Sequence, residues 1–315
     1  MTGRRGSGKR RWRRRASRRS SGPTECPTCF RPRRSGWICS LRAQGVGASV
    51  SASRSRARCS TSGGSVEVRV GRGVCVSRGG RSLRILAFEG SGAAAGVALL
   101  DQARIAGESA VDTRRARTEL LLELARRLLE DTGLAVSDLD RLAYSEGPGS
   151  FTGLRIGLAA VLGLSIGAGT PVVPVPSLEV IAYPWRGLGL PILPLTGHRR
   201  GQVYNAALRW DGRRFETLAP GASLALEALL ERCANLPSER LLFVGDAVDS
   251  LAESIRARFG ERAVCIASGS PRASDLAWLA CDPDRLEWRG HDLEGRSPRY
   301  LRGADARRPP PRAHS

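Results

Sequence analysis

The stretch Gly147–Gly157, with the sequence GPGSFTGLRIG, decides how the centre of this chain folds. An apolar run before it predicts a strand, and the apolar residues after it predict a buried helix over 152–167. Pro148 prevents a regular helix through the loop, and the glycines on either side of it allow positive φ. Ser150 or Thr152 can then cap the first free N–H groups of the helix. Such a corner either positions the helix or binds an anion at its N-terminus.

The net charge of +20 comes almost wholly from the first 82 residues. Of the 50 basic and 30 acidic residues in the chain, these 82 hold 21 basic ones and only two acids, Glu25 and Glu67. The rest of the chain keeps 29 basic and 28 acidic residues and is nearly neutral. The charge of this remainder gives no reason to expect direct contact with nucleic acid.

The same segment, residues 1–82, is rich in Arg, Ser and Gly without a sustained apolar period, which predicts a disordered arm. One interpretation is a tail that binds RNA or a membrane surface. The other is that the arm is not made, and that translation starts near Val76 or Leu83. We favour the second, because Met1 is the only methionine and the Arg-rich composition is typical of upstream reading frames in GC-rich genes.

The sequence contains neither a complete metal-binding motif nor an apolar segment long enough to span a membrane. Cys26 and Cys29 have the spacing of half a zinc knuckle, but no second CxxC or HxxxH completes it. The longest apolar stretch, 154–168, contains Arg155 and is shorter than the ~20 residues that span a bilayer. We therefore expect a soluble, cytoplasmic protein with no metal and no membrane partner.

From Leu83 onward, strand and helix patterns alternate in two successive halves, followed by a tail at 304–315. The first half, 83–186, predicts strands at 84–89, from 97, at 104–109 and at 171–176, and helices at 118–131, 152–167 and 177–183. The second half, 187–303, predicts strands at 190–195, 202–210, 213–218, 240–245 and 263–267, and helices at 224–234, 248–259 and 274–280. Asp211-Gly212 predicts a two-residue hairpin turn.

The stretch Gly147–Gly157 resembles the signature of the TsaB family, also called YeaZ, and we call it the signature segment. The resemblance runs from about Leu83 to Arg302 and includes Gly201-Gln-Val-Tyr204 and Pro298-Arg-Tyr-Leu-Arg302. It implies a duplicated, actin-like α/β fold, the class of acetate kinase, sugar kinases and heat-shock ATPases. The chain departs from the family pattern at Glu89, Gly90, Arg117, Glu123 and Gly197.

The resemblance also implies a function. TsaB proteins act as non-catalytic scaffolds that form a heterodimer with TsaD, the subunit that transfers a threonylcarbamoyl group to the adenosine beside the tRNA anticodon. It implies TsaE as a partner through the complex, tRNA as an indirect one, a homodimer as a second assembly, and no cofactor on this chain, with ATP used through partners. TsaD chemistry, and the old glycoprotease (M22) label, need histidines paired as HxxxH on one helical face, and His198, His291 and His314 are not so paired.

The alternative is a stand-alone nucleotide-dependent enzyme of the same fold, either a TsaD-like transferase or an ATPase or kinase. Such enzymes place an acid at the end of the first strand and a Gly-rich hairpin on the phosphates. Glu89 and Ser91 imitate this arrangement and are the candidates for a degenerate nucleotide site. We favour an ordinary strand end with a tight glycine turn, because no Gly-Lys-Ser/Thr loop and no clear second catalytic Asp accompany it.

The candidate contact with TsaD consists of the signature segment and the helices at 118–131 and 152–167. Each glycine in a helix costs ~1 kcal/mol relative to Ala, so repeated glycines suggest that another backbone approaches closely. The approaching backbone could belong to the sheet or to the partner, and Arg155 could be a plain surface charge or an interface ion pair. The candidate residues are Gly147, Pro148, Gly149, Ser150, Phe151, Thr152, Gly153, Arg155, Gly157, Gly163, Leu121, Leu124 and Leu128.

Overall fold

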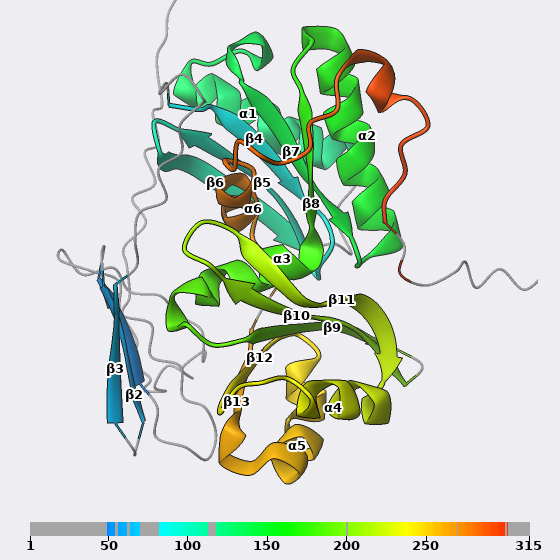
Figure 1. Cartoon of the computed structure of the whole chain (residues 1–315). Coiled ribbons are helices and arrows are strands. Elements are labelled where there is room, and N and C mark those ends of the chain that lie inside the picture. Colours follow the sequence, from blue (N-terminus) through cyan, green and yellow to red (C-terminus); the bar gives the residue numbers. More distant parts are fainter. Residues whose placement is uncertain are drawn as a thin grey trace, which may run out of the picture.

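A computed structural model of the chain contains two five-stranded mixed sheets with helices between and outside them (Figure 1). It describes residues 49–53, 56–61, 64–69, 82–112, 118–199, 201–268, 270–299 and 301. The fold follows from the sequence pattern, because the central strands are apolar on both faces and need cover on both sides.

The first sheet has the strand order β6-β5-β4-β7-β8. Its strands are β4 (Ile85–Glu89), β5 (Ala94–Asp101), β6 (Arg104–Asp112), β7 (Arg141–Gly147) and β8 (Val172–Pro176). The first three pair antiparallel, and β7 and β8 continue the sheet in parallel. The helices α1 (Thr118–Thr132), α2 (Phe151–Ala168) and α3 (Ser177–Ala182) follow β6, β7 and β8.

The second sheet repeats this topology with the order β11-β10-β9-β12-β13. Its strands are β9 (Ile192–Arg199), β10 (Gln202–Trp210), β11 (Phe215–Ala225), β12 (Leu241–Gly245) and β13 (Ala263–Ala267). The helices α4 (Leu226–Ala234), α5 (Val248–Phe259) and α6 (Ala273–Leu279) follow β11, β12 and β13. From β4 to α6, the chain therefore contains the same βββαβαβα arrangement twice in succession.

The two halves are interlocked through their third helices (Figure 1). Helices α1 and α2 cover the outer face of the first sheet, and α4 and α5 cover the outer face of the second. Between the sheets, α6 packs on the first sheet and α3 on the second, so each half covers a face of the other. The predicted boundary at 187 lies between the two sheets, and packing crosses it, because the apolar face of α6 is buried on strands of the first half.

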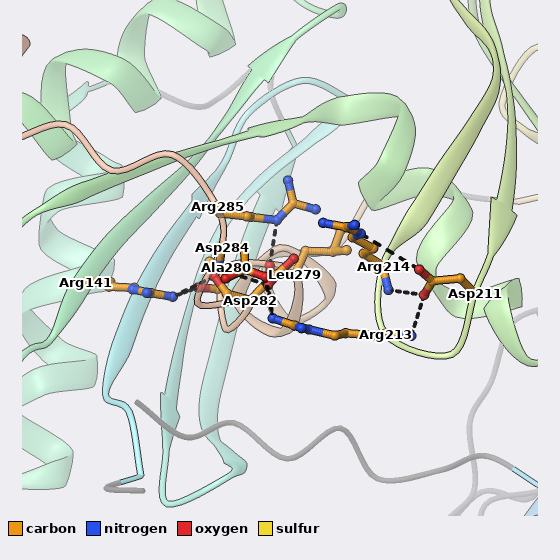
Figure 2. A network of polar contacts seen from close by, with 9 residues as sticks. All are labelled: Arg141, Asp211, Arg213, Arg214, Leu279, Ala280, Asp282, Asp284 and Arg285. Carbon is orange, nitrogen blue, oxygen red and sulfur yellow. Dashed lines mark hydrogen bonds and ion pairs between the residues drawn. The ribbon is translucent and has the colours of Figure 1, made fainter. Parts of the chain in front are cut away.

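The hairpin of the second half differs from the prediction. Trp210 pairs with Phe215, so four residues rather than two form its loop. The Asp211 carboxylate accepts the N–H groups of Arg213 and Arg214, both at 2.7 Å, which stabilises the longer loop. Figure 2 shows this loop against the turn that follows α6, where Arg213 reaches two carboxylates of that turn.

Part of the arm also differs from the prediction. Three strands, β1 (Ser49–Ser53), β2 (Arg56–Thr61) and β3 (Gly64–Arg69), pair antiparallel in a separate sheet. Their Thr and Val residues favour extended backbone. The prediction of disorder rested on the composition of the whole arm and did not consider this local preference. The rest of the arm, Arg117 and the tail at 304–315 lie outside the described residues.

Within the described residues, α2 is the one helix long and apolar enough, by length and composition, to cross a membrane. Its residues Leu158 and Val161 are buried in the core cluster that contains Phe88 of β4. This packing is that of a core helix in an α/β protein, and such helices meet the same criterion of length and composition.

Candidate functional site

The signature segment forms the turn from β7 into α2, as predicted. Gly147 has φ = +114°, its N–H donates to the Ser177 hydroxyl at 3.1 Å, and its bond to Pro148 is cis. Ser150 is the N-cap of α2, and its hydroxyl accepts the N–H of Gly153 at 3.3 Å. The predicted capping by Ser150 is thus confirmed.

The hairpin between β4 and β5 packs directly on this corner. Ser150 donates its N–H to the carbonyl of Ser91 at 2.8 Å. A Cβ on Gly149 would overlap Ser91, and a Cβ on Gly153 would overlap the carbonyl of Gly90. The signature glycines at these two positions are needed because a second backbone lies against them, and that backbone belongs to this chain.

Glu89, the candidate for a degenerate nucleotide site, is buried at the end of β4. Its Oε1 accepts the N–H of Ser91 at 2.7 Å, the hydroxyl of Ser91 at 2.6 Å and the hydroxyl of Ser145 at 3.0 Å. Burial raises the pKa of the Glu89 carboxyl above its ordinary value of 4.5, and the hydrogen bonds from Ser91 and Ser145 oppose only part of that rise.

The hydrogen bonds of the hairpin limit what it can bind. The N–H of Gly90 donates to Ser145 at 3.3 Å, and the N–H of Ser91 donates to Glu89. Both donors face groups of this chain, so neither is directed at a phosphate. Within the described part of the chain, no group of three or more His, Cys, Asp or Glu side chains could hold a metal ion.

The leucines of α1 belong to the core. Leu121 and Leu128 are buried, and Leu124 packs on the same cluster beside the first sheet. The exposed side of α1 is mostly charged, with Glu123 held by Arg126 and Arg127 and with Leu122 as its one large apolar residue among those described. The expectation that these leucines face a partner is therefore wrong, because the stripe is the side that α1 needs to cover its own sheet.

Helix α2 has two different faces. Gly157 is buried, and a Cβ there would contact only the carbonyl of Phe88, at 3.8 Å. Gly163 is exposed, with no atom within 4 Å of the position of a Cβ. The exposed residues on this second face are Phe151, Thr152, Arg155, Ala159, Gly163, Ile166 and Gly167. We call them the α2 stripe; Arg155 is the one charged side chain in it.

Two large apolar side chains, Phe151 and Ile166, are exposed in the α2 stripe. Phe151 is 53% exposed and Ile166 is 76% exposed, which is unusual for residues of this size. The guanidinium of Arg155 lies 3.9 Å from the centre of the Phe151 ring. Arg155 is thus a surface charge stacked on an exposed aromatic ring.

Sequence reasoning did not single out Ser145, Glu146 and Arg299 as contacts of this site. Ser145 holds Glu89 from the neighbouring strand, and Arg299 pairs with Glu146 at 3.1 Å, one residue before the signature segment. The terminal motif that contains Arg299 was visible in the sequence, but its place beside the signature depends on the fold.

The duplicated topology, with two helices between the sheets, defines the actin-like class of α/β proteins, as the resemblance implied. A family model described as TsaD, tRNA N6-adenosine threonylcarbamoyltransferase, matches residues 109–280. The TsaB protein of Bacillus subtilis is 29% identical over 226 residues, which cover 71% of this chain and 96% of that protein. The TsaB protein of Escherichia coli is 33% identical over 165 residues, which cover 50% of this chain and 69% of that protein.

A solved structure agrees with these relatives. The structure of YeaZ from Pseudomonas aeruginosa superposes with a TM-score of 0.57 at 26% identity and covers 70% of this chain and 100% of that one. The chain belongs to the TsaB (YeaZ) family.

Proposed function

We propose that this chain acts in the synthesis of threonylcarbamoyladenosine on tRNA, as a non-catalytic partner of the TsaD transferase. The names of the relatives, tRNA threonylcarbamoyladenosine biosynthesis protein TsaB, support the process. The observation that carries the partner role is the α2 stripe, an apolar surface that the protein's own core does not use.

The shape and chemistry of the stripe suit a helix of the partner. Residues Phe151, Arg155, Ala159, Gly163 and Gly167 recur every four positions, so they lie along one line of the helix. From Phe151 to Gly167 this line rises about 24 Å along the helix axis. The small residues in its second part allow a partner helix to approach closely, while Phe151 and Ile166 supply apolar area.

The hairpin between β4 and β5, whose Gly90 and Ser91 N–H groups donate to groups of this chain, supports the non-catalytic part of the proposal. A nucleotide-binding hairpin of this fold would need backbone donors and a carboxylate directed at phosphate and metal. Here Glu89 is directed at Ser91 and Ser145, and burial favours its uncharged form. Its Oε1 already accepts three hydrogen bonds from this chain, so that oxygen is not directed at a bound metal ion.

Reconstitution tests the proposal. The full chain is mixed with TsaD, TsaE, ATP and unmodified tRNA, and modified adenosine is measured with and without the chain. We expect the chain to form a stable complex with TsaD and to be required for modification, while the isolated chain neither hydrolyses ATP nor modifies tRNA. Absence of a TsaD complex, or ATP turnover by the isolated chain, would contradict the proposal and favour the stand-alone enzyme.

The same stripe could instead join two copies of the chain. The mass of the chain alone and of its mixture with TsaD, measured by light scattering, separates these assemblies. We expect any homodimer to be replaced by the heterodimer when TsaD is added, because both would use the stripe.

A further inference from the structure

The last described part of the chain, orange to red in Figure 1, returns over the first half, and we call residues 288–299 and 301 the C-terminal strap. Its first anchor is Trp288, which exchanges two backbone hydrogen bonds with Val172 at 2.8 and 3.0 Å. The Trp288 side chain is buried, with its ring 5.8 Å from that of Tyr144 on β7. The strap therefore begins as an addition to the edge of the first sheet.

The second anchor is at the entrance to the signature segment. The N–H of Arg299 donates to the carbonyl of Glu146 at 2.6 Å, and its guanidinium pairs with the Glu146 carboxylate at 3.1 Å. The carbonyl oxygen of Arg299 lies 2.5 Å from the position that a Cβ on Gly147 would take. Gly147 thus contacts both the carbonyl of Arg299 and the hydroxyl of Ser177.

The third anchor lies in the second half. Leu301 packs on the core cluster that contains Leu178 of α3, and its Cδ1 lies 3.3 Å from the position of a Cβ on Gly221 of β11. Within three residues, the strap contacts the turn that starts α2 and the core beneath the second sheet. Apart from its pair with Glu146, the Arg299 side chain is largely exposed.

We propose that Arg299 is a positioning residue for the partner surface, because it fixes the backbone at Glu146–Gly147, from which α2 and its stripe are presented. This inference rests on the proposed function for its partner, the TsaD transferase. Without the contact, the corner would occupy its binding geometry for a smaller fraction of the time, and the apparent affinity would fall by that fraction.

The test uses the full chain, the variants Arg299→Ala and Arg299→Lys, and two truncated forms. One truncation ends at Ser297 and removes the second and third anchors; the matched control ends at Leu301 and keeps them. Amide hydrogen exchange over residues 149–154, the dissociation constant for TsaD and the melting temperature are measured for each. Arg299→Ala should speed the exchange and weaken TsaD binding roughly three- to tenfold, the range for a charge-assisted hydrogen bond at a partly exposed site.

Arg299→Lys should recover part of both effects, and the chain that ends at Leu301 should behave as wild type. Wild-type exchange and wild-type affinity in Arg299→Ala would overturn the proposal. If the form that ends at Ser297 is unfolded, the variants Arg299→Ala and Arg299→Lys alone decide whether Arg299 positions the turn into α2. A wild-type chain that does not bind TsaD contradicts the proposed function, while the exchange of residues 149–154 still decides whether Arg299 positions the corner.

Discussion

Gly90 and Gly153 touch backbone to backbone, where the hairpin after β4 meets the first turn of α2. A Cβ on Gly90 would lie 2.5 Å from the carbonyl oxygen of Gly153, and the reverse substitution would also overlap. Neither glycine has positive φ. The pair therefore requires the absence of a side chain rather than the backbone freedom of glycine, and it fixes the signature segment to the hairpin.

Gly153→Ala should destabilise the protein, because its methyl group would overlap backbone that cannot move without shifting the hairpin. Overpacking of this kind costs about 1–3 kcal/mol, which lowers the melting temperature by several degrees in a protein of this size. Gly163→Ala is the matched control on the same helix. Since no atom lies near its Cβ position, it should stabilise α2 by up to about 1 kcal/mol. Equal melting temperatures for the two variants would contradict the assignment of their faces.

Gly163→Leu should leave the melting temperature nearly unchanged and weaken binding to TsaD, because the new side chain projects from the α2 stripe. A penalty of about 1–3 kcal/mol at an interface corresponds to roughly a five- to hundredfold loss of affinity. Gly157→Leu is the contrasting variant, since Gly157 is buried against β4 and its substitution should lower the melting temperature. Titration calorimetry and thermal melts measure both. Wild-type affinity in a folded Gly163→Leu protein would exclude the stripe as the contact.

Glu89→Gln should make the protein more stable than wild type at alkaline pH. Burial raises the pKa of Glu89 above its ordinary value of 4.5, so its contribution to stability is complete below that value and is lost as pH rises through the folded-state pKa. Glutamine resembles the protonated acid and does not titrate. Denaturant unfolding from pH 4 to pH 9 should show a difference that grows with pH in favour of the variant. A difference that does not change with pH would show that folding does not raise the pKa of Glu89.

Two arginines contact the turn after α6 and should differ strongly in importance. Arg141 is buried, donates to the carbonyls of Ala280 and Asp282 at 2.7 and 3.1 Å, and pairs with Glu287 at 2.7 Å. Arg213 reaches the same turn from the hairpin loop but is exposed (Figure 2).

Arg141→Met should therefore cost about 1–3 kcal/mol, because it removes the donor of two carbonyls and leaves Glu287 with Arg289 as its remaining ion pair. Arg213→Met should cost less than about 1 kcal/mol, as exposed ion pairs do. Urea denaturation of both variants gives the comparison. A cost for Arg213→Met as large as that for Arg141→Met would show that the loop contact holds the two halves together.

Much of the fold could be predicted from the sequence, because the information was local. The periods of the apolar residues set α5 at 248–259 and β10 at 202–210, with the bounds that the structure has. The signature segment set the turn into α2 and its Ser150 cap. The prediction was wrong for the loop at 211–214, where the Asp211 carboxylate accepts two backbone N–H groups and stabilises a longer turn than the one predicted.

The apolar, glycine-rich character of α2 can be read from the sequence, whereas the role of each glycine depends on how the helix packs. Gly153 and Gly157 face the hairpin and the sheet, while Gly163 faces outward, because the first sheet covers one side of the helix. Likewise, an apolar stripe on a helix does not specify which surface covers it. The structure shows that the leucines of α1 pack on the core of the first sheet. Local sequence fixes helix and strand through short-range geometry, whereas the use of each face depends on contacts between residues distant in the chain, such as Gly90 with Gly153 and Glu146 with Arg299.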